Sequence, residues 1–174
     1  MTDETLVVCD AGPLLVLAKL NVLHLLAGLY GRVHLARSVY EEIVTEGMRR
    51  GHEDAWTLSL FLDQMGWEPE VPGEAALPSA LASAHLDRGE RDTLHLAVVL
   101  GSRLVLVDES EGRRTARAMG LAVRGSLGIL VEAYRRGMIG KEQLRLYFAE
   151  LSRRQDIWID PALVERLRRE VLGG

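Results

Sequence analysis

Residues 6–13 read Leu-Val-Val-Cys-Asp-Ala-Gly-Pro, an apolar run that ends in an acid and a tight turn. Four consecutive apolar residues favour a buried strand at the centre of a parallel sheet. Pro13 fits the first turn of a following helix, because the N–H that proline lacks would be unpaired there in any case. The stretch therefore predicts a strand, a turn that carries Asp10, and a helix.

The same order of strand and acid recurs further along the chain. Residues 104–108 read Leu-Val-Leu-Val-Asp, which places Asp108 directly after a second apolar strand. Shorter strands are predicted around residues 33–35, 67–71 and 121–123, with helical segments between them. Alternating strands and helices predict an α/β domain with a mostly parallel sheet of about five strands, covered by helices.

Helices are predicted from apolar spacing, capping residues and glycine stops. Ser38 is expected to cap one of them, with Glu41 completing a capping box. Pro78 is expected to begin a helix that ends near Asp87. The remaining helices are expected over residues 14–20, 22–26, 55–64, 90–100, 112–119 and 126–136. The tail, residues 141–172, is expected to form two amphipathic helices, the second of which begins at Asp160-Pro161.

The composition fits a folded protein of modest size. With 174 residues, the chain is most simply one domain. Its net charge of −4 argues against nucleic-acid binding through bulk positive charge, but it allows one local basic rim. Cys9 is the single cysteine, which excludes an intrachain disulfide. The start of the chain is acidic, unlike a signal peptide, and no apolar run reaches the ~20 residues of a membrane span, so a cytosolic protein is expected.

Several familiar catalytic motifs are missing from the sequence. It has no phosphate-binding loop, no dinucleotide-binding glycine motif and no nucleophile elbow. Its five histidines lack the spacing of a zinc site. The chemistry is therefore sought among the acids.

The acids Asp10 and Asp108 carry the strongest functional signal. Each is either a turn residue or a ligand at the carboxyl end of a strand, where open α/β sheets bind ligands. Because two acids occupy the same kind of position after two strands, a chance placement of both is less plausible. Glu42, Glu90 and Asp92 lie on predicted helices. Their ordinary interpretation is a solvated helix face or a favourable charge in the first helical turn.

A pocket of carboxylates with few nearby cations suits a hard divalent metal. Arginines close to such a pocket could hold a phosphate group that the acids alone would repel. Arg113 and Arg114 follow Asp108, and Arg124 follows the last predicted strand. A plain surface role is the alternative for all three.

In this arrangement the chain resembles the PIN-like domains, and most closely a compact prokaryotic branch of that family. The resemblance covers most of residues 6–139 in order. The matching blocks are residues 8–15 (VCDAGPLL), 39–43 (VYEEI), 89–92 (GERD), 106–109 (LVDE) with Arg113, and 125–130 (GSLGIL) with 137–139 (GMI).

The resemblance implies a strand order of 3-2-1-4-5 and a ribonuclease site that depends on Mg²⁺ or Mn²⁺. It implies that Asp10, Glu42, Asp92 and Asp108 are the catalytic acids, and that Glu90 joins Asp10, Asp92 and Asp108 around the metal. It also implies residues 1–140 as a nuclease domain with a helical extension over residues 141–174. Many relatives are toxins that a small antitoxin holds inactive, and many form homodimers.

The expected reaction is cleavage of single-stranded RNA by a metal-activated water. Two departures from the family pattern leave a second interpretation open. Ala11 and Gly12 replace a hydroxyl residue after the first acid, and Leu106 replaces a threonine before the last one. The alternative is therefore an inactive or weakly active module that binds nucleic acid or protein. A dehalogenase-like phosphatase would need an acid at Gly12, which argues against that enzyme class.

Overall fold

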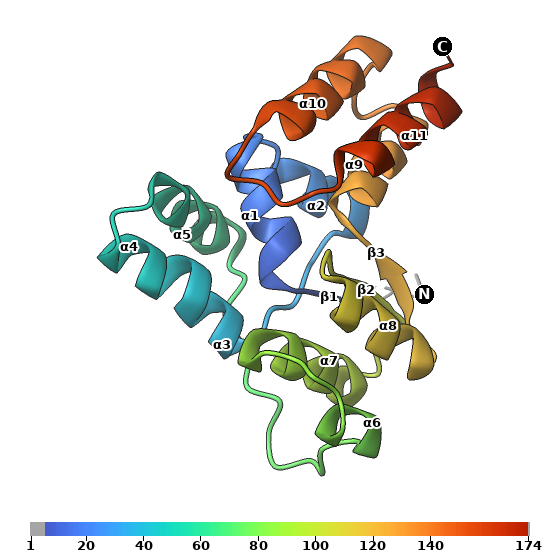
Figure 1. The fold of residues 1–174 in the computed structure, drawn as a ribbon. Helices are drawn as coiled ribbons and strands as arrows, with labels where there is room; N and C mark the ends of the chain where they lie inside the picture. The colour runs from blue at the N-terminus through green and yellow to red at the C-terminus, as the bar shows by residue number, and fades with distance from the viewer. Residues whose placement is uncertain (1–5, 174) are drawn as a thin grey trace. The chain divides into compact units, whose positions relative to one another are not determined.

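Three parallel strands form the sheet in the computed structural model, which describes residues 6–173 (Figure 1). The central strand β2 (Leu104–Leu106) pairs with β1 (Val7–Cys9) on one side and with β3 (Ala122–Arg124) on the other. Because the three strands are parallel, the residues that follow β1 and β2 emerge at the same edge of the sheet. Asp10 and Asp108, the first and the last of the predicted acids, therefore lie at this edge.

The predicted α/β class with a parallel sheet is confirmed, but the expectation of about five strands is wrong. Within residues 6–173, the predicted strands around residues 33–35 and 67–71 form only isolated bridges. One bridge joins Val8 and His34, and the other joins Ala36 and Glu70. These bridges follow the expected order of segments. The pairing stops at once because a helix begins directly after Ala36.

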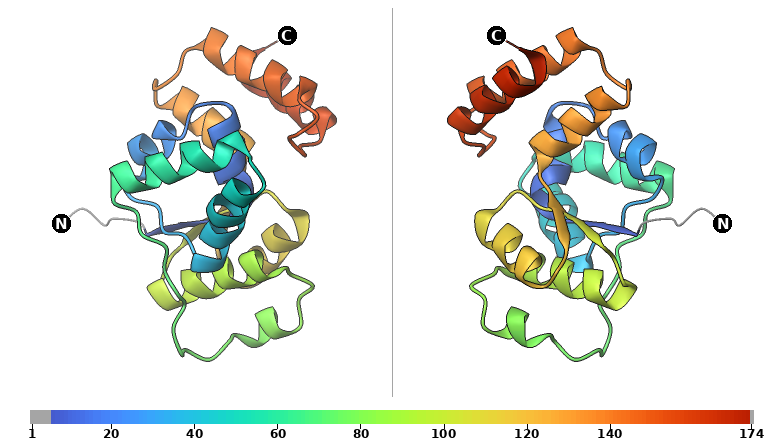
Figure 2. Two further views of the ribbon diagram at one scale, coloured as in Figure 1. Left: turned by 90° about the vertical axis from the view of Figure 1, so that its left-hand side faces the viewer. Right: turned by 90° about the vertical axis from the view of Figure 1, so that its right-hand side faces the viewer.

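Helices surround the sheet in the first of two compact units, whose described part is residues 6–126. Their bounds are α1 (Ala11–Lys19), α2 (His24–Tyr30), α3 (Arg37–Tyr40), the π-helix η1 (Glu41–Glu46), α4 (Gly47–Arg49), α5 (Glu53–Met65), α6 (Ser79–Ala82), α7 (Arg88–Leu100) and α8 (Ser110–Ala118). Helix α7 packs against β1 and β2, α8 packs against β3 and α7, and α1 packs against α5. Figures 1 and 2 show α7 and α1 on opposite faces of the sheet.

Two of the predicted helix boundaries are wrong. Helix α3 begins at Arg37, so Ser38 lies inside the first turn, where its side chain cannot cap the helix, and Ala36 takes the capping position. Asp87 does not end a helix but begins α7, because its carboxylate accepts the N–H of Glu90 at 2.8 Å. Helix α7 therefore starts at Arg88, and Asp92 lies beyond its first turn.

The second unit, residues 127–173, is helical. It contains most of α9 (Ser126–Arg135), followed by α10 (Lys141–Arg153) and α11 (Pro161–Leu172), which pack against each other. The predicted start of the last helix is confirmed, since Asp160 accepts the N–H of Ala162 at 2.9 Å.

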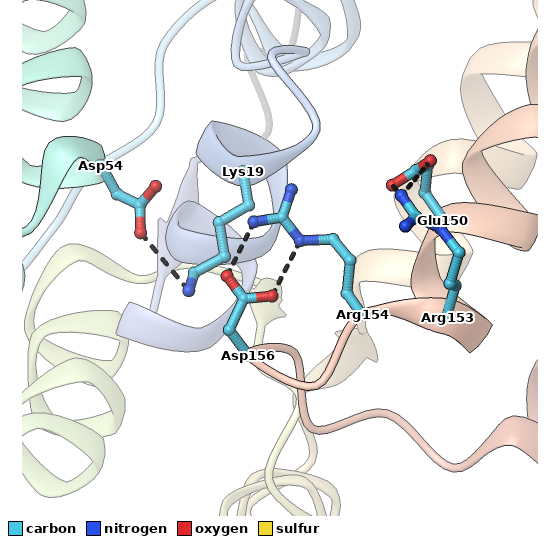
Figure 3. Close-up of polar contacts among 6 residues, drawn as sticks. All are labelled: Lys19, Asp54, Glu150, Arg153, Arg154 and Asp156. Carbon is cyan, nitrogen blue, oxygen red and sulfur yellow. Dashed lines mark hydrogen bonds and ion pairs between the residues drawn. The ribbon is translucent and has the colours of Figure 1, made fainter.

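Surface ion pairs occur in both units (Figure 3). Lys19 pairs with Asp54 at 3.4 Å in the first unit. In the second, Arg153 pairs with Glu150 at 2.8 Å and Arg154 with Asp156 at 2.7 Å. Across the described part of the chain, no helix has the length and apolar character required to cross a bilayer.

Candidate active site

The ends of β1 and β2 bring Asp10 and Asp108 into the same region. Asp10 follows β1 directly, and its backbone N–H donates to the carbonyl of Leu106 in β2 at 2.9 Å. The side chain of Asp108 lies against the turn after β1, where a Cβ added to Gly12 would be 3.2 Å from Asp108 Oδ2. Glycine at this position therefore allows the second acid to approach the turn that carries the first.

Asp10 is almost fully buried, with 4% of its surface exposed. Burial is the main cause that raises the pKa of Asp10 to about 7, and the negative charges of Asp87 and Glu90 act in the same direction. The Thr93 hydroxyl donates to Asp10 Oδ1 at 3.2 Å, which opposes the increase. The carboxyl group of Asp10 therefore changes charge near neutral pH.

Asp108 is held by the first residue of α9. The N–H of Ser126 donates to Asp108 Oδ1 at 2.7 Å, and the Ser126 hydroxyl donates to Oδ2 at 2.6 Å. Arg113 is turned toward the same carboxylate, because a Cβ added to Gly125 would lie 2.8 Å from Asp108 Oδ1 and 2.9 Å from Arg113 Nη1. Burial raises the pKa of Asp108 despite these contacts, which lower it.

Glu42 reaches the start of α7 from the π-helix. A Cβ added to Gly89 would lie 3.1 Å from Glu42 Oε2 and 3.4 Å from Asp87 Oδ1. Glycine at position 89 therefore lets two carboxylates from different elements come to the same place. Burial raises the pKa of Glu42, and the negative charge of Asp87 raises it further.

Glu90 is fixed by a reciprocal cap at the start of α7. Glu90 Oε2 accepts the N–H of Asp87 at 3.0 Å, while the Asp87 side chain accepts the N–H of Glu90. Burial raises the pKa of Glu90, and the charges of Asp87, Glu109 and Glu111 raise it as well. Electrostatic interactions therefore connect Glu42, Asp87, Glu90 and Asp10, although their residues come from three separate parts of the sequence.

The other predicted site residues have different surroundings. Asp92 lies 3.9 Å from Arg88 in an i,i+4 ion pair on α7. Arg114 is exposed and donates to both oxygens of Glu111, at 2.6 and 2.8 Å. Arg124 donates to the hydroxyl of Tyr30 at 3.0 Å. Of the three predicted phosphate-binding arginines, Arg113 is the one that lies near a site acid, Asp108.

Three residues of the site were not predicted as such: Asp87, Thr93 and Ser126. Asp87 resembles a turn residue in the sequence, although a good N-cap three residues before a glutamate is a recognisable signal. Thr93 and Ser126 supply hydroxyls to Asp10 and Asp108, the two acids whose neighbouring hydroxyl residues were thought to be missing. No local pattern in the sequence points to either contact.

The donor set fits a hard divalent cation by its chemistry. It consists of carboxylate oxygens whose pKa values are raised by burial and, for Asp10, Glu42 and Glu90, also by neighbouring negative charges, and a bound cation would relieve this repulsion. Within residues 6–173, no three acid, histidine or cysteine side chains are grouped closely enough to surround a metal. Mg²⁺ suits such an open arrangement, because it keeps several waters and uses only one or two carboxylates.

The bond between Ser126 and Asp108 makes a testable contribution to stability. We expect Ser126→Ala to lower the free energy of unfolding by about 1.5–3 kcal/mol at pH 7, because the partly buried carboxylate of Asp108 loses a hydroxyl donor. Urea denaturation at pH 7 and pH 4 measures this. The loss should be smaller at pH 4, because burial raises the pKa of Asp108 above its usual value and a larger share of the carboxyl group is protonated there. Ser102→Ala is the control, since the buried Ser102 hydroxyl bonds only to neutral groups. Equal losses at both pH values for Ser126→Ala would contradict the role of the charge.

Comparison with known proteins identifies one family. The family model described as PIN domain matches residues 6–172, which is nearly the whole chain and includes both compact units. No curated protein and no solved structure matches the chain.

Proposed function

Because the chain belongs to the PIN domain family, we propose that it is a divalent-metal-dependent endoribonuclease that cleaves single-stranded RNA. PIN domains are generally metal-dependent nucleases, and they typically use divalent ions such as Mg²⁺. The observation that carries the proposal is the set of carboxylates at one edge of the sheet, of which Asp10 and Glu90 are buried. Asp10 and Asp108 follow neighbouring strands, and Glu90 and Glu42 approach from helices.

Each side chain has a separate part in the proposed mechanism. Asp10 and Asp108 would bind Mg²⁺ or Mn²⁺ directly, and Glu90 and Glu42 would accept hydrogen bonds from the waters that the ion keeps. When bound, the ion supplies a water of lowered pKa and positive charge for the phosphate oxygens. Thr93 and Ser126 keep the Asp10 and Asp108 carboxylates oriented. Arg113, turned toward Asp108, is placed to attract the phosphate of the strand.

The preference for a single strand follows from charge and shape. The net charge is −4, so the chain lacks the general positive charge that holds a duplex by its backbone. A flexible single strand can expose one phosphate to a recessed site. The narrower part of the proposal, a toxin controlled by a small antitoxin and acting as a homodimer, is supported by the family resemblance alone.

The proposal is tested with purified protein and a mixed set of single-stranded RNAs. Cleavage is measured with MnCl₂, with MgCl₂ and with EDTA, and a duplex RNA of the same sequence is the matched substrate. We expect cleavage of the single strand that EDTA abolishes. Absence of cleavage by folded protein under all conditions would replace the enzyme with the alternative, a binding module of the same fold.

Two acids of α7 provide a sharper test of the site. Glu90 is buried and interacts with Asp10, whereas Asp92 forms an ion pair with the exposed Arg88. We expect Glu90→Gln to lower the cleavage rate at least about tenfold, while Asp92→Asn has the smaller effect. Glutamine keeps the reciprocal cap of α7, so the fold should be preserved in both variants. If Asp92→Asn causes the larger loss, Asp92 is the metal ligand that the family resemblance implies, and Glu90 is structural.

A further inference from the structure

The outer face of α7, which points away from the sheet, carries a histidine that is nevertheless buried. Thr93 faces the sheet, since its hydroxyl donates to Asp10. Because an α-helix turns by about 200° over two residues, His95 lies on the opposite side of α7. Only 8% of His95 is exposed. Another part of the chain therefore covers this face.

The cover is the segment that precedes α7, residues 71–86, which we call the strap. Its short helix α6 packs against α7 and α8, and Leu81 of this helix is fully buried. Figures 1 and 2 show α6 on the side of α7 that faces away from the sheet. In the described part of the chain, the strap makes backbone–backbone hydrogen bonds only within itself. Side-chain contacts therefore hold the strap on α7, and a segment held in this way opens more easily than a paired strand.

Arg91 lies one helical turn before His95, on the same face of α7. Its Nη2 donates to the carbonyl of Leu86 in the strap at 3.3 Å. Its Nε is buried and has no hydrogen-bond partner among the described residues. Asp92, the next acid along α7, pairs with Arg88 instead. The partly buried guanidinium of Arg91 is therefore not neutralised by a carboxylate.

The imidazole of His95 has an unpaired nitrogen as well. Its Nε2 is buried and, among residues 6–173, has no hydrogen-bond partner. Buried polar atoms are nearly always paired with protein, with ordered water or with a ligand. The Nε of arginine can only donate a hydrogen bond, and Nε2 of histidine donates in its protonated form and in one neutral tautomer. Two neighbouring donors, one of them on a cation, call for an acceptor that carries negative charge.

We propose that Arg91 and His95 bind a phosphate group on the outer face of α7, after the strap moves off this face. The planar guanidinium matches the oxygens of a phosphate and neutralises part of its charge, and the imidazole provides a further donor. Free phosphate and the terminal phosphate of an RNA fragment share this chemistry. The inference goes beyond the proposed function, because binding at this face requires neither a metal ion nor cleavage.

Nuclear magnetic resonance of the histidine rings tests the proposal in metal-free full-length protein with EDTA. The chain has five histidines, and the signal that is lost in His95→Gln identifies the ring of His95. We expect inorganic phosphate to shift this signal until it reaches a plateau. Potassium chloride of equal ionic strength should not shift it.

Substitutions of Arg91 show whether the guanidinium holds the phosphate. We expect Arg91→Ala to weaken phosphate binding about tenfold or more, since hydrogen bonds to a charged group are lost. Arg91→Lys keeps the charge but not the planar fork, so its binding should be intermediate. Arg117→Ala is the matched control, because Arg117 is an exposed arginine on α8, and it should bind phosphate normally. Thermal unfolding without phosphate confirms that each variant is folded.

The role of the strap is tested by Leu81→Ala, which removes a buried side chain that holds α6 in place. Because less free energy is then required to move the strap, phosphate binding should become tighter. Unchanged or weaker binding would reject the movement of the strap.

Two RNA oligonucleotides of one sequence, with a 5′-phosphate and with a 5′-hydroxyl, distinguish the sources of the ligand in EDTA. A shift of the His95 signal by the 5′-phosphate form alone, at lower concentration than with inorganic phosphate, would assign the site to RNA ends. A shift by inorganic phosphate alone would assign it to free phosphate.

The proposal is overturned if phosphate leaves the His95 signal unchanged, or if chloride shifts it equally. It is also overturned if folded Arg91→Ala and Arg91→Lys both bind phosphate as the unmodified protein does. In these cases ordered water satisfies the two nitrogens. Metal-dependent cleavage is unaffected by any of these outcomes, because the measurements are made without metal.

Discussion

Replacing Asp10 by asparagine is expected to lower metal-dependent RNA cleavage by more than about a hundredfold. Even a residue that only supports a metal ligand typically contributes 10- to 100-fold, and Asp10 is proposed as a ligand itself. Its position supports this expectation, since Asp10 is 4% exposed and interacts electrostatically with Glu90 and Asp87. Initial rates on a labelled single-stranded RNA in MnCl₂, with both proteins at equal concentration, measure the effect.

The control for this experiment is the folded state of the variant. Asparagine has the shape of aspartate and retains an acceptor for the Thr93 hydroxyl, so the circular dichroism spectrum should be unchanged. Asp63→Asn is a matched substitution of an exposed acid on helix α5 that is not among the site acids, and it should leave cleavage intact. Cleavage by Asp10→Asn at more than a tenth of the normal rate would remove Asp10 from the proposed mechanism.

Stability without metal is expected to fall as the pH rises from about 4 to about 7. The pKa of Asp10 is raised from 3.8 to about 7 in the folded protein, so the folded state binds the proton more tightly than the unfolded state does. The stabilising effect of this proton is complete below pH 3.8 and is lost as the pH rises through about 7. The difference between the two pKa values corresponds to about 4 kcal/mol.

This pH dependence can be attributed to Asp10 by comparison. Burial also raises the pKa values of Glu42, Glu90 and Asp108, so these groups change stability in the same direction. Urea denaturation of the normal protein and of Asp10→Asn, both in EDTA, should give curves that diverge between pH 4 and pH 7, with the variant more stable at pH 7. Addition of Mn²⁺ should restore much of the stability of the normal protein at pH 7. Parallel curves would show that Asp10 is ionised in the metal-free fold.

The hydroxyl groups illustrate how a sequence pattern can mislead. Ala11, Gly12 and Leu106 leave Asp10 and Asp108 without the neighbouring hydroxyls that other family members often have. In the fold, Thr93 and Ser126 donate to these acids from α7 and from the start of α9. The sequence separations are 83 and 18 residues, so no local rule could have indicated these partners. The departure from the family pattern is therefore a weaker argument for an inactive protein than it is in the sequence alone.

Features that depend on local chemistry could be predicted from the sequence. The apolar runs before Asp10 and Asp108 predicted the strands β1 and β2, and Asp160-Pro161 predicted the start of α11. These features follow from strand burial, backbone restriction and capping, which act over a few residues. The number of strands was overestimated, because a segment such as residues 33–35 has strand composition but forms only one bridge before α3 begins.

Which acids come together depends on how the helices and strands pack. Glu90 and Asp92 are two residues apart, yet the turn of α7 directs Glu90 into the site, while Asp92 contacts Arg88. Asp87 joins the acids because Gly89 leaves room for Glu42 beside it. The physical reason is that burial and repulsion between charges depend on distance in space, and packing of α7 on the sheet sets these distances. Residue type and spacing supplied the candidate acids, and the packed structure determined their neighbours and their charge.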